Sequence, residues 1–163
     1  MKNIVVINGT GGCGKDTFIK LISKYKRVYN FSSIDKVKEI ARIIGWDGTK
    51  DEKSRKFLSD LKNLTKEYND MPYNCTKEAI EEFKNSDCEI MFIHIREPEE
   101  IKRIVDTFGA KTLFIKRENL NEITSNSSDG RVSKYKYDYS ILNTTLEEYE
   151  KKACEFINWL EKV

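Results

Sequence analysis

The stretch INGTGGCGKDTF, residues 7–18, most constrains what this chain can fold into. It follows a short apolar strand, residues 3–7, and it opens a helix with an apolar stripe. Four residues separate Gly9 from Gly14, and Lys15 follows directly, which is the spacing of the phosphate-binding loop G-x-x-x-x-G-K-[ST]. The spacing, the lysine and the order strand, turn, helix together argue against a chance match and predict an anion site at the turn.

The turn itself has the chemistry of a phosphate site. Glycines let the backbone curl so that several N–H groups face one anion, Lys15 reaches the β- and γ-phosphates, and a hydroxyl binds Mg²⁺. Asp16 stands where Ser or Thr is expected, and the hydroxyl of Thr17 comes one residue later. Because a carboxylate repels phosphate oxygens, we expect Asp16 to point outward, where an acid suits the helix dipole. The residues predicted to hold the nucleotide are Gly9, Gly11, Gly12, Cys13, Gly14, Lys15, Asp16 and Thr17.

Apolar strands alternate with helical patterns along the chain. The predicted strands are residues 3–7, 27–31, 89–95, 111–116 and 137–142. The predicted helices are residues 16–25, 34–44, 51–68 and 98–108, and a last helix that starts at a capping box of Thr144 and Glu147. This alternation predicts an α/β fold of three layers, α/β/α, with a central five-stranded parallel sheet that binds ligands at the carboxyl edge of its strands.

Residues 1–163 are expected to form a single domain. Two stretches of it depart from the alternation of strands and helices. Residues 45–87 hold two helices and no strand, so we expect residues 35–87 to form a helical insertion that binds an acceptor. Residues 118–136 are polar and predict a short lid. The apolar stripes that predict buried helix faces here are Val37, Ile40, Ala41 and Ile44, and then Phe57, Leu58, Leu61, Leu64 and Tyr68.

Composition excludes several classes of function. Lysine and arginine number 29 against 27 acids, a net charge of +2, so nucleic acid is not an expected partner. The four cysteines form no C-x-x-C pair and there is one histidine, which argues against a zinc site. Without a signal peptide or an apolar run of about 20 residues, the chain is expected to be cytoplasmic, away from membranes, with free thiols. Monomer and homodimer both remain open.

The sequence GKDT, residues 14–17, resembles the loop of deoxynucleoside monophosphate kinases and phosphomevalonate kinases. It is also similar to the GKGT of adenylate kinases, in which the second position after the lysine supplies the threonine. The resemblance implies a P-loop NTPase fold, ATP and Mg²⁺ as cofactors, and the metal-facing role on Thr17.

The stretch FSSIDKVKEIA, residues 31–41, carries the candidate acceptor residues. Asp35 accepts a hydrogen bond from the attacking group or orients an acceptor sugar; alternatively it only borders the helix. Lys38 and Arg42 lie four residues apart and share a helix face that grips a phosphate, or they are solvated. The stretch resembles the D-x-x-K that begins the acceptor region of the same kinases. Arg55 is a weaker candidate of the same kind.

The third predicted strand ends in FIHIREPEE, residues 92–100. Similar kinases read S-D-x-R here, with an acid that holds the metal through water, whereas this chain has His94. Either Glu97 or Asp35 takes that role, or the protein binds nucleotide and catalyses poorly. Arg96 matches the arginine of that pattern, and we expect it to bind phosphate.

Two further stretches resemble parts of these kinases. Arg117 follows the fourth strand and Arg131 lies in the lid, where the resemblance implies arginines that stabilise charge during transfer; a surface position is the alternative for both. YDYSILNTTLEE resembles the end of dephospho-coenzyme A kinases and implies that Asn143 and Thr144 lie beside the adenine, although both also suit helix caps.

The expected function is transfer of the γ-phosphate of ATP–Mg²⁺ to a small phosphorylated acceptor, foremost a nucleoside or deoxynucleoside monophosphate. The expected catalytic residues are Lys15, Asp35, Arg96, Arg117 and Arg131, and the expected acceptor residues are Asp35, Lys38, Arg42, Arg55 and Arg96. The alternatives are another small-molecule kinase, similar to dephospho-coenzyme A kinase, and a nucleotide-binding regulatory protein without kinase activity.

Overall fold

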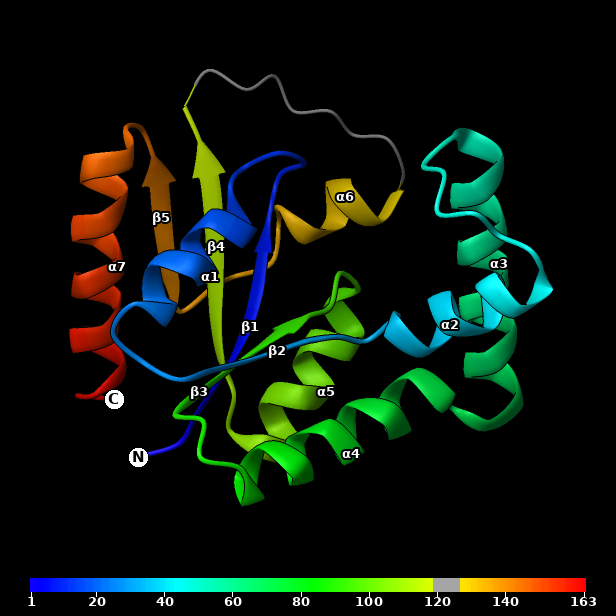
Figure 1. The fold of residues 1–163 in the computed structure, drawn as a ribbon, viewed down its shortest axis with the longest axis horizontal. Helices are drawn as coiled ribbons and strands as arrows, with labels where there is room; N and C mark the ends of the chain where they lie inside the picture. Colours follow the sequence, from blue (N-terminus) through cyan, green and yellow to red (C-terminus); the bar gives the residue numbers. More distant parts are fainter. Residues whose placement is uncertain (119–126) are drawn as a thin grey trace. The chain divides into compact units, whose positions relative to one another are not determined.

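The computed structural model describes residues 1–118 and 127–163. Its centre is a five-stranded parallel sheet in the order β2-β3-β1-β4-β5 (Figure 1). The strands are β1 (Asn3–Gly9), β2 (Val28–Ser32), β3 (Ile90–His94), β4 (Lys111–Arg117) and β5 (Tyr139–Asn143). All five predicted strands are therefore confirmed, with ends that differ by up to two residues.

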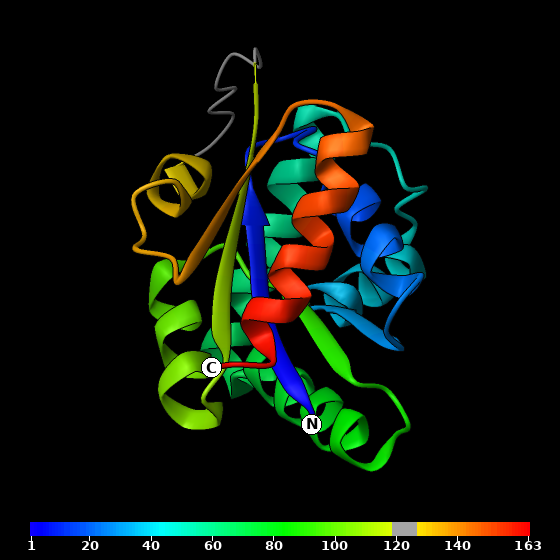
Figure 2. The same cartoon turned by 90° about the vertical axis from the view of Figure 1, so that its left-hand side faces the viewer.

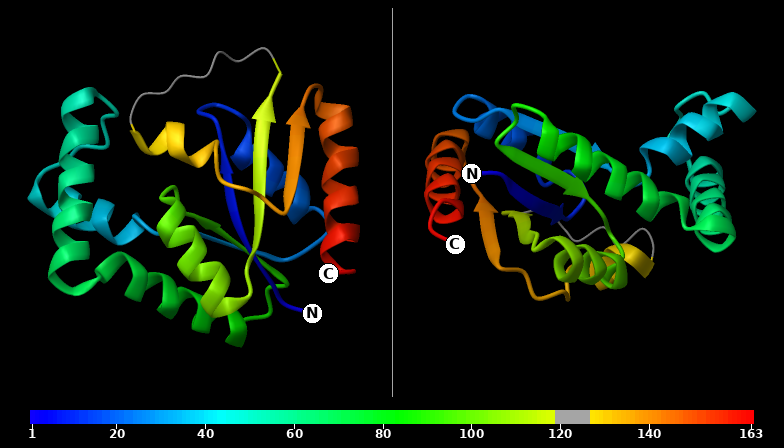
Figure 3. Two further views of the ribbon diagram at one scale, coloured as in Figure 1. Left: turned by 180° about the vertical axis from the view of Figure 1, so that it is seen from behind. Right: turned by 90° about the horizontal axis from the view of Figure 1, so that it is seen from below.

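Helices cover both faces of this sheet. The helices are α1 (Lys15–Ser23), α2 (Asp35–Ile44), α3 (Glu52–Asn69), α4 (Met71–Asn85), α5 (Pro98–Phe108), α6 (Ser127–Val132) and α7 (Leu146–Leu160). Figures 2 and 3 show α1 and α7 on one face and α5 and α6 on the other. The predicted three-layer α/β/α fold is confirmed. Within the described residues no helix has the length and apolar character needed to cross a membrane.

The central strand β1 explains why the sheet forms. Val5, Val6 and Ile7 are fully buried, because β1 pairs with β3 on one side and β4 on the other and helices cover both of its faces. On the α1 and α7 face, the ring of Phe18 lies 5.4 Å from that of Tyr149 and 5.6 Å from that of Phe156. This apolar layer places the end of β1 and the start of α1 against α7.

The chain divides into two compact units, of which one comprises Met1–Asn30 with Ser86–Val163 and the other Phe31–Asn85. The second unit holds α2, α3 and α4, and the prediction of two helices and no strand within residues 45–87 is confirmed.

The predicted buried face of the second unit is partly wrong. Val37 and Ala41 are buried, but Ile44 is exposed, and in α3 Leu64 and Tyr68 are 64% and 86% exposed. The prediction is right for Phe57, Leu58 and Leu61, which are all half-buried. The inner side of α3 then continues through Lys62, which is buried, and Thr65, and not through Leu64 and Tyr68.

The predicted start of the last helix is wrong by one residue. The cap of α7 is Thr145, whose hydroxyl accepts a hydrogen bond from the Glu148 N–H at 3.3 Å, and not Thr144. Both residues are threonines followed three positions later by a glutamate, so the sequence pattern fits either. In the predicted lid, residues 118–136, the short helix α6 was not foreseen, and residues 119–126 lie outside the described residues.

Candidate functional site

The glycine-rich turn forms a tight loop between β1 and α1. Cys13 N–H donates to the Thr10 carbonyl at 3.0 Å, and Gly12 and Gly14 have φ of +69° and +93°. Gly14 caps α1, and its carbonyl accepts the first helical hydrogen bond from Phe18 N–H at 2.9 Å. At φ +93° a residue with a Cβ is strained, so this cap requires glycine. The loop therefore has the curled backbone that its sequence predicts.

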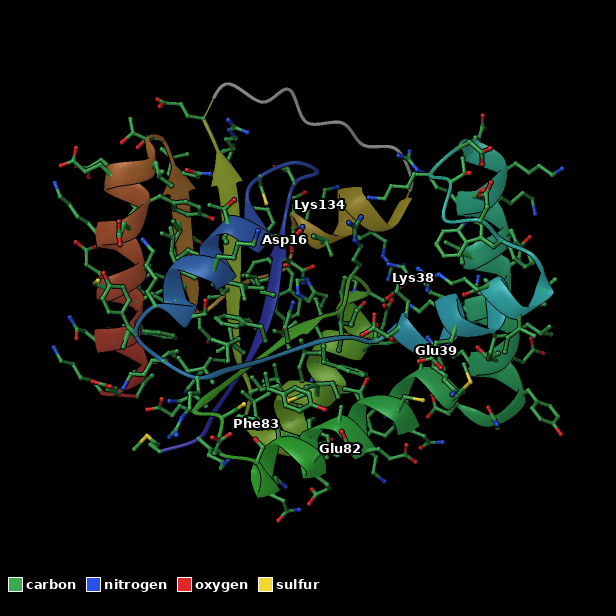
Figure 4. The ribbon with its side chains drawn as sticks, viewed as in Figure 1. Asp16, Lys38, Glu39, Glu82, Phe83 and Lys134 are labelled. Carbon is green, nitrogen blue, oxygen red and sulfur yellow. The ribbon has the colours of Figure 1, made fainter. Side chains whose placement is uncertain are left out.

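The side chains of the loop divide into an exposed and a buried set. Asp16 and Thr17 are exposed in the first turn of α1 and Lys15 is half-buried. Figure 4 shows Asp16 at this end of α1, on the outside, as expected for an acid near the positive end of a helix. Cys13, by contrast, is 1% exposed.

The charges around the loop act on the Cys13 thiol. Burial raises its pKa, and the positive charges of Lys15 and Arg96 lower it by less. Arg96 follows β3, and β1 and β3 are parallel neighbours that end at the same edge of the sheet, so Arg96 and Lys15 both lie at that edge.

Side chains from three other elements contact the backbone of the loop. Arg117, at the end of β4, donates from Nη1 to the Gly12 carbonyl at 3.5 Å, and Asn143, at the end of β5, donates from Nδ2 to the Cys13 carbonyl at 3.1 Å. Tyr149 of α7 donates from its hydroxyl to the Gly14 carbonyl at 2.8 Å. The structure thus brings Arg117 and Asn143 to the loop.

Two of these contacts add to the sequence expectation. Asn143 is predicted to lie beside the adenine, and in the structure its amide contacts the loop backbone, while Thr144 is exposed one residue later. Tyr149 was not singled out, because its position in the apolar stripe of α7 indicates only a core residue. Burial raises the pKa of its hydroxyl further above the ordinary value of 10.0, so it remains a donor well into the alkaline range.

The end of β3 carries polar contacts of its own. His94 Nε2 lies 2.8 Å from Asn30 Oδ1, and Asn8, the residue before the loop glycine, donates from Nδ2 to the Ile95 carbonyl at 2.6 Å. Arg96 follows, exposed. In the predicted lid, Arg131 of α6 is paired with Glu99 in the first turn of α5.

The remaining acceptor candidates all belong to the unit Phe31–Asn85. Asp35 accepts a hydrogen bond from Ser32 N–H at 3.0 Å, which agrees with the alternative that it borders α2. The Arg42 guanidinium lies 5.0 Å from the centre of the Trp46 ring. Lys38, labelled on α2 in Figure 4, is half-buried, and Arg55 is exposed on α3.

Metal binding was predicted at Thr17 alone. Within residues 1–118 and 127–163, no group of three or more histidine, cysteine, aspartate and glutamate side chains has an arrangement suited to a metal ion. An Mg²⁺ ion that arrives with nucleotide phosphates needs few protein ligands, and the exposed hydroxyl of Thr17 beside the loop fits that demand.

Comparison with known proteins shows the fold and no more. The sequence matches no protein-family profile and no curated protein. Among solved structures, the chain is similar to TT1252 from Thermus thermophilus, with a TM-score of 0.57, 17% identity and 96% of each chain covered. It is similar to the Deinococcus radiodurans tunicamycin resistance protein, with a TM-score of 0.56, 10% identity and 96% of each chain covered. An uncharacterized protein from Eubacterium ventriosum has a TM-score of 0.52 and 16% identity over 99% of this chain and 100% of that one.

Proposed function

We propose that this protein is an ATP-dependent phosphotransferase. It transfers the γ-phosphate of ATP–Mg²⁺ to a small phosphorylated acceptor, foremost a nucleoside or deoxynucleoside monophosphate. The observation that carries the proposal is the loop at the end of β1, which opens α1 with Lys15 and has its backbone carbonyls bonded to side chains outside it. Loops of this shape bind phosphates through N–H groups and a helix start. The cytoplasm, where ATP is made and thiols stay reduced, is the proposed location.

The residues of this chain divide the work of transfer among them. The loop N–H groups and Lys15 would hold the β- and γ-phosphates, and Thr17 would hold the Mg²⁺, which supplies neutralisation of the phosphate charge. Arg117, beside Gly12, and Arg131 stabilise the charge that develops on the transferring group. An oxygen of the acceptor phosphate forms a bond to the γ-phosphorus as the bond to the β–γ bridging oxygen breaks, which releases ADP.

The acceptor side needs cations more than it needs a base. A phosphate acceptor is already an anion, so no proton has to be removed by a strong base. Arg96 follows β3 at the edge where β1 ends, and Lys38, Arg42 and Arg55 are the cations proposed for the acceptor. Asp35 then orients the acceptor. If the acceptor is instead a hydroxyl, as in a kinase similar to dephospho-coenzyme A kinase, Asp35 is the base and Asp35→Asn abolishes turnover.

A second candidate is a nucleotide-binding protein without transferase activity. His94 favours it, because an imidazole bonded to Asn30 stands where similar kinases carry an acid for the metal.

One assay separates these candidates. ADP release is measured with ATP–Mg²⁺ against a panel of nucleoside and deoxynucleoside monophosphates and dephospho-coenzyme A, and ATP binding is measured by calorimetry. Acceptor-dependent ADP supports the transferase; ATP binding with no acceptor-dependent ADP supports the second candidate. Lys15→Ala should lose ATP binding, whereas its matched control Lys20→Ala, on the exposed last turn of α1, should keep it. A wild-type chain that does not bind ATP contradicts both.

A further inference from the structure

Successive carbonyls of the loop are each bonded to a different element. The acceptors are the carbonyls of residues 12, 13 and 14, and the donors are Arg117, Asn143 and Tyr149, at 3.5, 3.1 and 2.8 Å. The donors come from β4, β5 and α7, which follow the loop by more than 100 residues in the sequence. The loop is therefore braced by the C-terminal part of the chain.

The direction of these carbonyls matters for an anion. In a loop that binds phosphate through N–H groups, a carbonyl turned toward the site repels the ligand and removes an N–H from it. A carbonyl turned into the protein is satisfied only if a donor meets it there. Asn143 provides such a donor for the Cys13 carbonyl, and Tyr149 gives the Gly14 carbonyl a second donor beside the helical bond from Phe18 N–H.

The packing around these donors leaves the loop little freedom. Tyr149 is 1% exposed, and its ring lies 5.4 Å from that of Phe18 in α1. A Cβ placed on Gly14 would lie 2.8 Å from Asn143 Nδ2 and 3.6 Å from the Tyr149 hydroxyl oxygen. The two donors thus press against the loop at the residue that begins the helix.

We propose that Asn143 and Tyr149 are positioning residues, which hold the carbonyls of Cys13 and Gly14 inward and so keep the loop N–H groups aimed at the phosphates before the nucleotide arrives. The identity of the anion as ATP rests on the proposed function. A loop ordered in advance loses less conformational entropy on binding, so the bracing contributes to affinity. The structure accordingly gives Asn143 a contact with the loop backbone, which the sequence did not reveal.

The first experiment measures the loop without any ligand. Amide hydrogen exchange of residues 10–15 is followed by NMR in the wild type, Tyr149→Phe and Asn143→Ala. Tyr149→Phe removes one hydroxyl and leaves the ring packed on Phe18. The matched control is Tyr139→Phe, because the ring of Tyr139 packs against those of Phe156 and Trp159, with ring centres 5.3 and 4.9 Å away.

The expected result is local. Exchange of the loop amides should be about fivefold to tenfold faster in Tyr149→Phe and in Asn143→Ala, as for the loss of one buried hydrogen bond. In both test variants the amides of β1 should exchange at the wild-type rate. In Tyr139→Phe the loop amides should also exchange at the wild-type rate. Loop exchange that is unchanged in both test variants overturns the proposal, and so does an increase spread evenly over the core. Asn143→Ala carries the test by itself if Tyr149→Phe does not fold.

The second experiment uses ATP–Mg²⁺ as the probe. Both test variants should bind it about fivefold to tenfold more weakly than Tyr139→Phe. If transfer is detected, the KM for ATP should rise and the KM for the acceptor should not. Faster loop exchange with unchanged ATP affinity overturns the link to binding. A wild-type chain that does not bind ATP contradicts the proposed function. In that case the exchange experiment still tests whether Asn143 and Tyr149 hold the loop in place.

Discussion

The imidazole of His94, at the end of β3, lies 2.8 Å from the side-chain oxygen of Asn30 in the neighbouring strand β2. An amide oxygen only accepts, so His94 donates this hydrogen bond from Nε2. The bond joins two adjacent strands at the edge where β1 also ends. It gives His94 a structural contact at the position where the resemblance to kinases predicts an acid.

His94→Asn should therefore lower kcat/KM for ATP by less than about tenfold, well below the loss of a general base. Asn30→Ala removes the same bond from the other side. The loss in the double variant should be smaller than the sum of the two single losses, because both variants remove the same hydrogen bond. Steady-state kinetics measures all three, and a loss above about 100-fold in His94→Asn alone would mean that the imidazole takes part in the transfer.

Gly9 is predicted to be required for packing, in contrast to Gly11 in the same loop. A Cβ on Gly9 would lie 2.4 Å from both the Cys13 Sγ and the Ile115 carbonyl oxygen, whereas a Cβ on Gly11 meets nothing within 4 Å. Gly9→Ala should lower the free energy of unfolding by about 1–3 kcal/mol, and Gly11→Ala should change it by less than about 0.5 kcal/mol. Urea denaturation measures both, and equal midpoints for the two variants would be inconsistent with this packing.

Cys13 should be the slowest thiol of the loop's own unit to react. Burial raises its pKa above the ordinary value of 9.0 and leaves 1% of the residue exposed, whereas Cys88 and Cys154 are half-buried. A raised pKa means less thiolate at pH 8, and the thiolate is the nucleophile. Iodoacetamide at pH 8 should label Cys88 and Cys154 first, with Cys13 reacting only as the pH rises past 9 or the chain unfolds. Peptide mass spectrometry measures the order, and early labelling of Cys13 would show that the loop opens.

The loop and the sheet were predictable because each depends on residues close together in the sequence. Gly9, Gly14 and Lys15 fix the turn by spacing alone, and β1 has an apolar centre, Val5 to Ile7, as a strand covered on both faces has to have. The stripe of α3 was predicted less well. Leu64 and Tyr68 continue an apolar periodicity that the packed side of the helix does not follow. Apolar periodicity predicts that a helix has a buried side, but which side of the helix that is depends on how neighbouring helices pack against it.

The residues that the sequence did not reveal are those whose role depends on contacts across the chain. Tyr149 reads as a core residue of α7, and only its 2.8 Å contact with the Gly14 carbonyl, 135 residues away, gives it a place at the loop. The sequence places Asn143 at the correct edge of the sheet, but it does not reveal the contact of this side chain with the Cys13 carbonyl. Thr144 and Thr145 offer the same cap pattern, and the backbone at the end of β5 decides between them. Such choices are made by tertiary structure and not by local sequence.

Asn8 is predicted to contribute most to stability among the polar residues next to the loop. It is 3% exposed and donates to the Ile95 carbonyl at 2.6 Å, so it ties the end of β1 to the segment that follows β3. Asn8→Ala leaves this carbonyl without its donor and should lower the free energy of unfolding by about 1–3 kcal/mol.

The matched control for Asn8 is Asn85→Ala. Asn85 also donates from Nδ2 to a backbone carbonyl, that of Glu81 at 2.9 Å, but on the exposed surface of α4. Water replaces this donor when it is removed, so the change should stay below about 0.5 kcal/mol. Urea denaturation of the unit that contains each residue gives both values. Because Asn8 directly precedes Gly9, Asn8→Ala should also weaken ATP–Mg²⁺ binding, while Asn85→Ala should not. Equal stability losses in the two variants would mean that burial of Asn8 does not determine its contribution.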